Sequence, residues 1–302
     1  MTMLFSILSS DILPIFLIAG AGYLLSRYVG TNVKTLAHVV FYALLPCLVF
    51  RLLVTSGQTG PELGRMALLA AVLIGAMGVL GFVVATALRL GRVDLRVFLL
   101  VVMFSNSGNY GLPVVQFAFG ADALAHATVF FLTGSVLTYT VGALVAAGGR
   151  LGFLAAVARV ARMPAIYGVL LAVPVFVTGT PVPDALMRPV RLLSDAALPL
   201  MMLVLGMQLE RATRPRRPLV VALSVALSLV AAPLVALGVT SLLGVSGPAR
   251  QAAVTLSSMP VAVTTTILAL EFDLDPDFAT SAVFLSTILS PLTLTPLIAY
   301  LK

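Results

Sequence analysis

The sequence predicts an all-α membrane protein of ten transmembrane helices, built as two inverted five-helix repeats in which helices four and nine are broken. Hydrophobic residues make up 60% of the 302 residues and charged residues only 10%, which lies far outside the composition of soluble domains. The mean hydropathy, +1.13, agrees with this class. Because each span takes roughly 20 apolar residues, ten spans use roughly 200 and leave no room for a soluble domain.

Helix-stopping or polar residues separate the ten apolar segments, for example from Gly57 to Pro61 and from Arg214 to Pro218. The first segment follows Asp11 rather than a basic stretch, so we expect it to be retained as a helix and not removed as a signal peptide. The predicted helices span residues 5–27, 34–55, 63–88, 95–119, 124–147, 164–180, 185–208, 218–243, 249–271 and 277–301.

Prolines recur at near-equal distances in the two halves of the chain, with separations of 150, 153 and 147 residues. Five helices in each half is an odd number, so the two halves would enter the membrane in opposite senses, as in many inverted-repeat membrane proteins. The alternative is chance, because 18 prolines give some equal spacings anyway. The predicted repeats are residues 1–150 and 151–302. The proline pairs are Pro14 with Pro164, Pro46 with Pro199, and Pro113 with Pro260.

Lysine and arginine are distributed unequally between alternate loops, with 12 on one side, called here the arginine-rich side, and 6 on the other. Cytoplasmic loops carry the excess, which places both termini outside the cytoplasm in the plasma membrane. Because the basic residues form no continuous stripe, the net charge of +7 indicates topology rather than nucleic-acid binding. The arginine-rich side holds Arg27, Lys34, Arg89, Arg92, Arg96, Arg150, Arg159, Arg162, Arg211, Arg214, Arg216 and Arg217; the other side holds Arg51, Arg65, Arg188, Arg191, Arg250 and Lys302.

Helix four carries a polar, glycine-containing stretch in the middle of a span. Polar groups in hydrocarbon are costly unless partnered, and non-helical backbone at that depth is tolerated only where protein buries it or it lines a water-filled cavity. Pro113 lacks the N–H that continues a helix and suits the first turn of a new half-helix, which we expect over residues 114–119. The substrate-binding candidates here are Ser105, Asn106, Asn109, Gly111 and Pro113.

Helix nine has a corresponding interruption at Pro260, flanked by hydroxyl groups instead of glycine and asparagine. Two half-helices that begin near the membrane midplane would direct positive N-terminal ends and free amide N–H groups at one place, which is an anion site. Carbonyl groups that end the first halves could bind a cation. The candidates here are Met259, Pro260, Thr264 and Thr265 for the substrate, and Ser257, Ser258 and Thr266 for a coupled ion.

Each of these features has a simpler alternative. A proline can merely kink a helix, and serine or threonine can bond to the backbone one turn back. Asp195 lies slightly inside an apolar segment and is a candidate proton carrier, unless it pairs with Arg191 one turn earlier. Met202 is a candidate for the substrate cavity, although methionines of a helix more often pack. Its neighbours Met201, Met207 and Gln208 share this interpretation.

With these segments in view, the chain resembles the auxin efflux carrier family, which includes bacterial dicarboxylate permeases and the plant PIN exporters, over nearly its whole length. The resemblance rests on the residues from Asn106 to Pro113, Leu44 to Pro46 with Phe50, Pro199 with Gly206, and Met259 to Ala262 followed by Ser286 and Thr287.

The resemblance implies a scaffold of helices 1, 2, 6 and 7 and a core of helices 3–5 and 8–10, with helices four and nine crossing at their breaks as in sodium–bile acid symporters. It places Asn106 or Asn109 and the turns at Pro113 and Pro260 at the family's substrate site. From the helix-two motif, Pro46 and Phe50 are further substrate-binding candidates. The long cytoplasmic loop of many plant members is replaced here by residues 148–163.

These expectations converge on a secondary carrier of small organic anions, carboxylates above all, that works by elevator-type alternating access. The rival within transport is a sodium-coupled symporter of a bile-acid-like or neutral solute. An enzyme is not expected, because H-E-x-x-H is missing and no mid-span acid accompanies a nucleophile; a receptor or sensor is left open. Cys47 is the only cysteine, so no metal site or cofactor is expected beyond coupling Na⁺ or H⁺. The partners are the substrate and the bilayer, and the oligomeric state, a homodimer included, is open.

Overall fold

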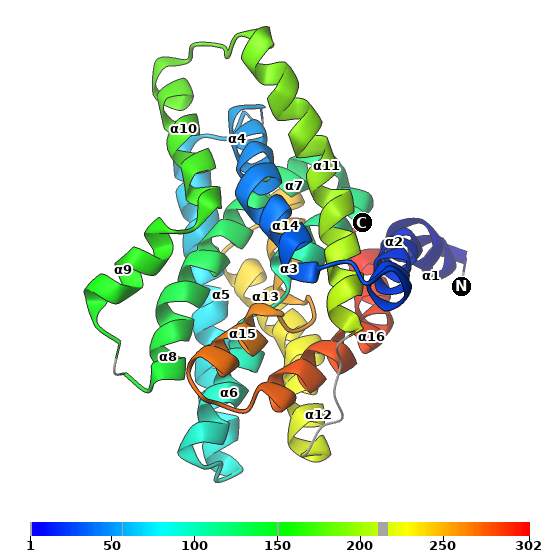
Figure 1. Ribbon diagram of the computed structural model, residues 1–302, viewed down its shortest axis with the longest axis vertical. Coiled ribbons are helices and arrows are strands. Elements are labelled where there is room, and N and C mark those ends of the chain that lie inside the picture. The colour runs from blue at the N-terminus through cyan, green and yellow to red at the C-terminus, as the bar shows by residue number, and fades with distance from the viewer. Residues whose placement is uncertain (1, 56, 150, 211–216) are drawn as a thin grey trace.

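Figure 1 shows the computed structural model, which describes residues 2–55, 57–149, 151–210 and 217–302. Within those residues the chain forms helices and no strand, with one isolated antiparallel bridge between Ser105 and Val261. Seven described helices are long and apolar enough to cross a membrane: Met3–Val29, Val33–Thr55, Gly60–Ala87, Ser107–Ala147, Asp184–Leu209, Pro218–Leu242 and Pro276–Leu301. A shorter apolar helix covers Pro164–Val175. The predicted all-α membrane class is therefore confirmed.

The first half of the chain contains helices that follow the predicted ranges within a few residues. Gly120, with φ of 81°, interrupts α7 and separates its residues 112–119 from the rest. The elements are α1 (Thr2–Ile7), η1 (Leu8–Ile12), α2 (Leu13–Leu24), η2 (Leu25–Val29), α3 (Val33–Val39), η3 (Val40–Leu44), α4 (Leu45–Thr55), α5 (Gly60–Ala87), α6 (Arg92–Met103), η4 (Ser107–Gly111), α7 (Leu112–Leu137), η5 (Thr138–Gly142) and α8 (Ala143–Ala147), where η denotes a π-helical turn.

The second half begins with a short helix, α9, which the sequence did not predict. Four arginines counted for the topology, Arg150, Arg211, Arg214 and Arg216, lie outside the described residues, as does the predicted repeat boundary at residue 150. The elements are α9 (Phe153–Ala161), α10 (Pro164–Thr178), α11 (Asp184–Leu209), α12 (Pro218–Ala226), η6 (Leu227–Ala231), α13 (Ala232–Leu242), α14 (Gly247–Ser257), α15 (Thr264–Glu271) and α16 (Pro276–Leu301).

Four of the π-helical turns end two residues before a proline. Each turn lets the helix continue, because its wider i→i+5 hydrogen bonds shift the ladder past the missing proline N–H. Pro199, by contrast, lies inside α11 without such a turn. The simple-kink interpretation therefore describes most of these prolines better than a break does. The turns and their prolines are η1 with Pro14, η3 with Pro46, η4 with Pro113 and η6 with Pro233.

Two groups of helices pack side by side. In one group, α11 lies along α2 and α4, and α10 lies along α4. In the other, α14 lies along α7, while α5 packs on both α6 and α7. Glycine permits the close approach in the first group, since a Cβ atom on Gly206 would overlap the backbone of Ala19, and one on Gly22 that of Leu203. Small residues at such crossings are typical of membrane helices.

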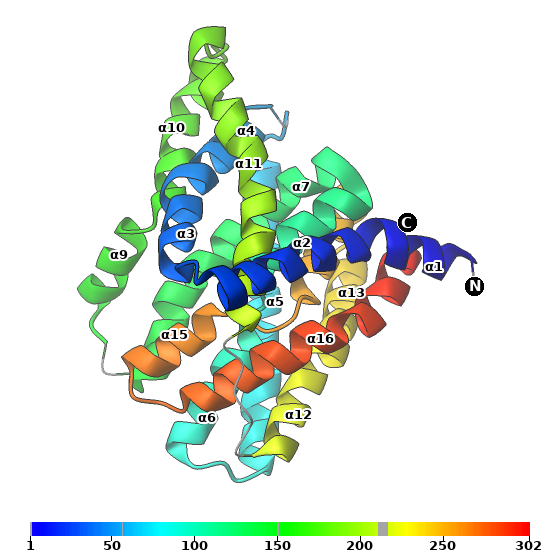
Figure 2. The same cartoon turned by 45° about the vertical axis from the view of Figure 1, so that its right-hand side comes forward.

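The two chain ends lie close together on one side of the bundle (Figures 1 and 2). The Lys302 ammonium lies 2.5 Å from the Asp11 carboxylate, which is buried in the π-helical turn η1. This ion pair joins the first helix of the chain to the last.

Candidate functional site

The two helix breaks meet in the interior and pair through their backbones. Asn106 N–H donates to the Pro260 carbonyl at 2.6 Å, and Ala262 N–H donates to the Phe104 carbonyl at 2.9 Å, around the bridge between Ser105 and Val261. These two hydrogen bonds satisfy backbone groups that neither broken helix can pair by itself. The crossing of the two breaks is thus a short antiparallel contact, called here the crossover.

The first break lies upstream of its predicted position. Phe104, Ser105 and Asn106 are non-helical, and the helix resumes at Ser107 and runs to residue 119. The prediction that Pro113 interrupts the helix and that the second half begins near residue 114 is therefore wrong. Pro113 lies in the first turn of α7, buried, where η4 accommodates its missing N–H.

The second break does include the predicted proline. Residues 258–263 are non-helical, and Pro260 lies among them. Its carbonyl accepts from Asn106, just as the Phe104 carbonyl accepts from Ala262, so about the crossover Pro260 is equivalent to Phe104 and not to Pro113. Ser286 of α16 supports this segment, because its Oγ accepts the Val261 N–H at 3.0 Å.

Free amide groups gather where the two second halves begin. In η4, Gly111 N–H donates to the Asn106 carbonyl at 3.0 Å, whereas the N–H groups of Gly108 and Asn109 have no hydrogen-bond partner within the described residues. The N–H groups of Val263 and Thr264, at the start of α15, also have no hydrogen-bond partner within the described residues. Unpaired N–H groups with a helix dipole behind them attract negative charge.

The two asparagines of helix four bring side-chain donors and acceptors to the same place. Asn106 is 6% exposed and Asn109 is 5% exposed. Asn109 Nδ2 donates to Gln208 Oε1 of α11 at 3.4 Å, while Asn106 Nδ2 and Asn109 Oδ1 have no partner among the described residues. A buried polar atom without a partner is costly, which indicates a ligand or water position. Gln208 was only a weak candidate in the sequence.

Most of the candidate hydroxyl groups near the second break already have a hydrogen-bond partner. Ser258 Oγ donates to the Val254 carbonyl at 2.6 Å, and Thr265 Oγ1 donates to the Ala262 carbonyl at 2.7 Å. Thr266 Oγ1 accepts from Thr280 at 3.4 Å, and Thr264 is half-buried. For Ser258 and Thr265 the structure thus favours the simpler alternative, bonding to their own backbone.

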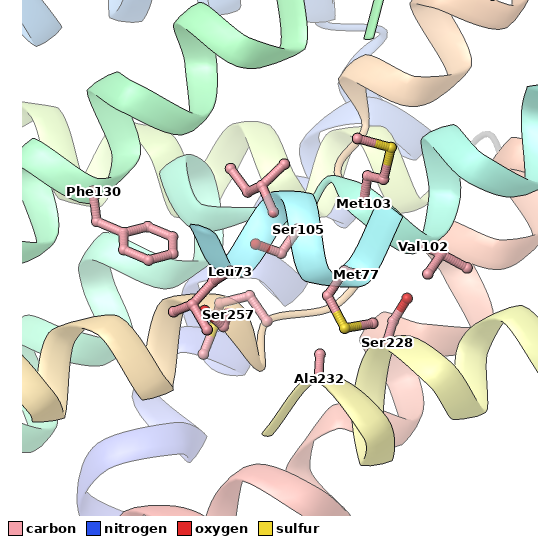
Figure 3. Close-up of a pocket in the computed structure, with 11 residues that line it drawn as sticks. Leu73, Met77, Val102, Met103, Ser105, Phe130, Ser228, Ala232 and Ser257 are labelled. Atoms are coloured by element: carbon pink, nitrogen blue, oxygen red, sulfur yellow. The ribbon is translucent and has the colours of Figure 1, made fainter. Parts of the chain in front are cut away.

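Ser257 differs from these hydroxyls, because its Oγ is buried and has no partner in the described part of the chain. It lines a cavity of about 20 Å³ beside the crossover, together with Ser105, Ser228 and apolar side chains that include Met259 (Figure 3). Ser105 Oγ and Ser228 Oγ already donate to the carbonyls of Leu256 and Ser224, at 2.8 and 3.1 Å. The cavity has room for one water molecule or a small cation.

The remaining apolar candidates lie at packed contacts between helices. Met259 and Met202 are buried in one apolar core, and Phe50 packs partly buried against it. Gly111 allows α14 to approach, since a Cβ atom there would lie 2.5 Å from Leu256 Cδ2. Pro46 lies where α4 meets α10, and its carbonyl would lie 2.5 Å from a Cβ on Gly168.

Asp195 pairs with Arg51 across α4 and α11, not with Arg191. The Asp195 side chain is 65% exposed, so it lies away from the buried crossover. Arg191 instead lies 4.0 Å from Asp184. The predicted alternative of an Arg191–Asp195 pair is therefore wrong, and Arg51, which borders an apolar segment, has an acidic partner.

Comparison with known proteins finds a matching family and similar proteins. A family model described as membrane transport protein matches residues 7–156 and 153–298. A protein of Methanothermobacter thermautotrophicus described as an uncharacterized transporter is 29% identical over 300 residues, which cover 97% of this chain and 98% of that protein. Another uncharacterized transporter, from Methanocaldococcus jannaschii, is 23% identical over 270 residues, covering 87% and 88% of the two chains.

Proposed function

Because the chain belongs to this membrane transport protein family, auxin efflux carrier-like and not enzymatic, we propose that it is a secondary carrier of small organic anions, carboxylates above all. The observation that supports this most is the set of buried, unpartnered donors at the crossover. These are the N–H groups of Gly108 and Asn109 and the side-chain amide of Asn106. Such donors stabilise a carboxylate without a fixed positive charge.

The burial of the crossover supports alternating access of the elevator type. A substrate larger than water has no path to Asn106 and Asn109 while their side chains are at most 6% exposed. Asn109 contacts Gln208, which belongs to the helix group of α2, α4, α10 and α11. We propose that this group is the scaffold, and that the other helices move against it as the core to expose the site.

Ten spans in two inverted repeats fit the helix bounds. The apolar segment Ser107–Ala147 is interrupted at Gly120, where we place the turn between the fourth and fifth spans. The helices α6 with η4, α14 with α15, and α10 supply the spans that are too short or broken to be recognised singly. The two family matches, residues 7–156 and 153–298, meet near the proposed repeat boundary. The proposed repeats of residues 1–150 and 151–302 have this support.

Ion pairs support the sidedness of the loops. Six ion pairs between described residues each join two residues of the same proposed side, as an alternating topology requires. We propose that the arginine-rich side is cytoplasmic and that both termini lie outside, in the plasma membrane. On the arginine-rich side are Arg27–Glu210, Arg159–Glu271 and Arg217–Asp94; on the other side are Arg51–Asp195, Arg191–Asp184 and Lys302–Asp11.

Sodium coupling is the second candidate, because Ser257 Oγ is unpartnered beside a cavity of the size of one small cation. Thermal unfolding of the purified protein with a panel of mono- and dicarboxylates, with and without Na⁺ and across pH, distinguishes the two. Stabilisation by a carboxylate without Na⁺ supports the anion carrier. Stabilisation by Na⁺ that Ser257→Ala removes supports the symporter, and no stabilisation by any carboxylate contradicts the proposed substrate class.

A further inference from the structure

An apolar groove lies on the outer surface of the bundle between α16 and the helix formed by η6 and α13. Its volume is about 380 Å³. Leu229 and Leu297 are buried at its floor, while Leu234 and Leu292 stand at its edges with 63% and 74% of their surface exposed. The groove forms because α16 packs closely on α12 and η6 but makes no comparable contact with α13. Figure 2 shows α16 passing in front of this bent helix.

The groove ends at an arginine that has no acidic partner. Tyr300 lines this end, and the Arg250 guanidinium lies 5.6 Å from the centre of its ring. Arg250 Nη2 lies 3.5 Å from Tyr300 Oη and 3.5 Å from Ser241 Oγ. Its Nε is buried without a partner, and no carboxylate lies within ion-pair distance of it among the described residues.

The position of this end fits a membrane–water interface. Ser241 is next to the end of α13, Arg250 is in the first turn of α14, and Tyr300 is next to the end of α16. Tyrosine and arginine are favoured at that level of a bilayer. From there the groove follows α13 and η6 back to Leu229, about 12 Å of helix from Leu237, into the depth that lipid tails occupy.

We propose that this groove binds one anionic phospholipid, whose phosphate contacts Arg250 and Tyr300 and whose acyl chain lies between α13 and α16. An apolar groove alone would accept any lipid tail. The unpaired guanidinium adds the preference for an anionic headgroup, because arginine matches phosphate geometry and the start of α14 adds partial positive charge. The site is separate from the crossover, so this proposal does not depend on the transported substrate.

Native mass spectrometry of the delipidated protein tests the proposal with phosphatidylglycerol and phosphatidylcholine of the same chains. We expect phosphatidylglycerol to bind about fivefold more tightly than phosphatidylcholine, because this is the gain in affinity that one arginine gives toward an anionic lipid. Arg250→Gln should remove this preference. Arg92→Gln is the matched control. Arg92 also lies in the first turn of a helix and has no acidic partner among the described residues, but it belongs to the arginine-rich side, away from the groove. Thr293→Phe should fill the groove and weaken binding of both lipids.

Four results would overturn the proposal: equal binding of the two lipids by the unchanged protein, an undiminished preference in Arg250→Gln, inorganic phosphate displacing the lipid as well as free phosphatidylglycerol does, or a dimer that forms only when lipid is removed. The last result would assign the groove to a second copy of the chain. If Arg250→Gln does not fold, Tyr300→Leu changes the same headgroup contact at an exposed side chain, and an unchanged preference there equally contradicts the proposal.

Discussion

Polar groups at the crossover are unequal on its two sides. Asn106 and Asn109 each keep one side-chain atom without a partner, whereas the hydroxyl of Thr265 is bonded to the backbone of its own turn. The crossover places Ala262 where the first break has Asn106. Helix four therefore offers the free Nδ2 group of Asn106 and the second N–H of Asn109 Nδ2, whereas helix nine offers backbone N–H groups and the unpartnered hydroxyl of Ser257.

Asn109→Ala should weaken binding of the most stabilising carboxylate at least tenfold, because a hydrogen bond to a charged group contributes about 1.5–3 kcal/mol. Thr265→Ala should change the dissociation constant by less than threefold. Isothermal titration of both purified variants measures this. A larger loss in Thr265→Ala would show that helix nine dominates anion recognition.

At the scale of helices, the sequence predicts the spans well but not the site of the first break. The apolar segments and their separators determine helix ends to within a few residues. Pro113 suggested a break at its own position. The π-helical turn η4 instead accommodates the missing proline N–H, and the helix is interrupted nine residues earlier, at Phe104. That choice depends on pairing with Pro260 and Ala262, a long-range contact that local residue patterns do not contain. The contact between Asn109 and Gln208 is also long-range, so local residue patterns do not predict it.

The contact between α2 and α11 gives a prediction for a matched pair of glycines. Gly22 of α2 lies against the backbone of Leu203, whereas a Cβ atom on Gly20, two residues away, would meet no atom within 4 Å. Gly22→Ala should destabilise the protein by about 1–3 kcal/mol, because the helices must separate. Gly20→Ala should be neutral or slightly stabilising. Thermal unfolding in detergent compares them, and equal midpoints would contradict the close packing.

At the scale of the whole molecule, the proposed motion of core against scaffold requires contacts between the groups to break. The Asp11–Lys302 pair joins the first helix to α16 and so links the two groups, whereas Arg51–Asp195 lies within the scaffold. Both pairs lie on the same proposed side of the membrane, which makes the second a control for the first.

Cross-linking these pairs tests the motion. In a Cys47→Ala background, a short bismaleimide between cysteines in Asp11→Cys/Lys302→Cys should stop transport, because the core can no longer shift. The same reagent on Arg51→Cys/Asp195→Cys should leave transport within about twofold of the unlinked protein. Transport that continues in the first cross-linked variant would argue against an elevator-type movement at this contact.

The measurement that tests the central claim most directly is uptake of radiolabelled mono- and dicarboxylates by liposomes that contain the purified protein, with gradients of substrate, pH and Na⁺ imposed in turn. We predict uptake of at least one carboxylate above protein-free liposomes, reduced at least tenfold by Asn109→Ala and little affected by Thr265→Ala. If no carboxylate moves under any of these gradients, or if Asn109→Ala transports as well as the unchanged protein, the crossover is not the site of a carboxylate carrier.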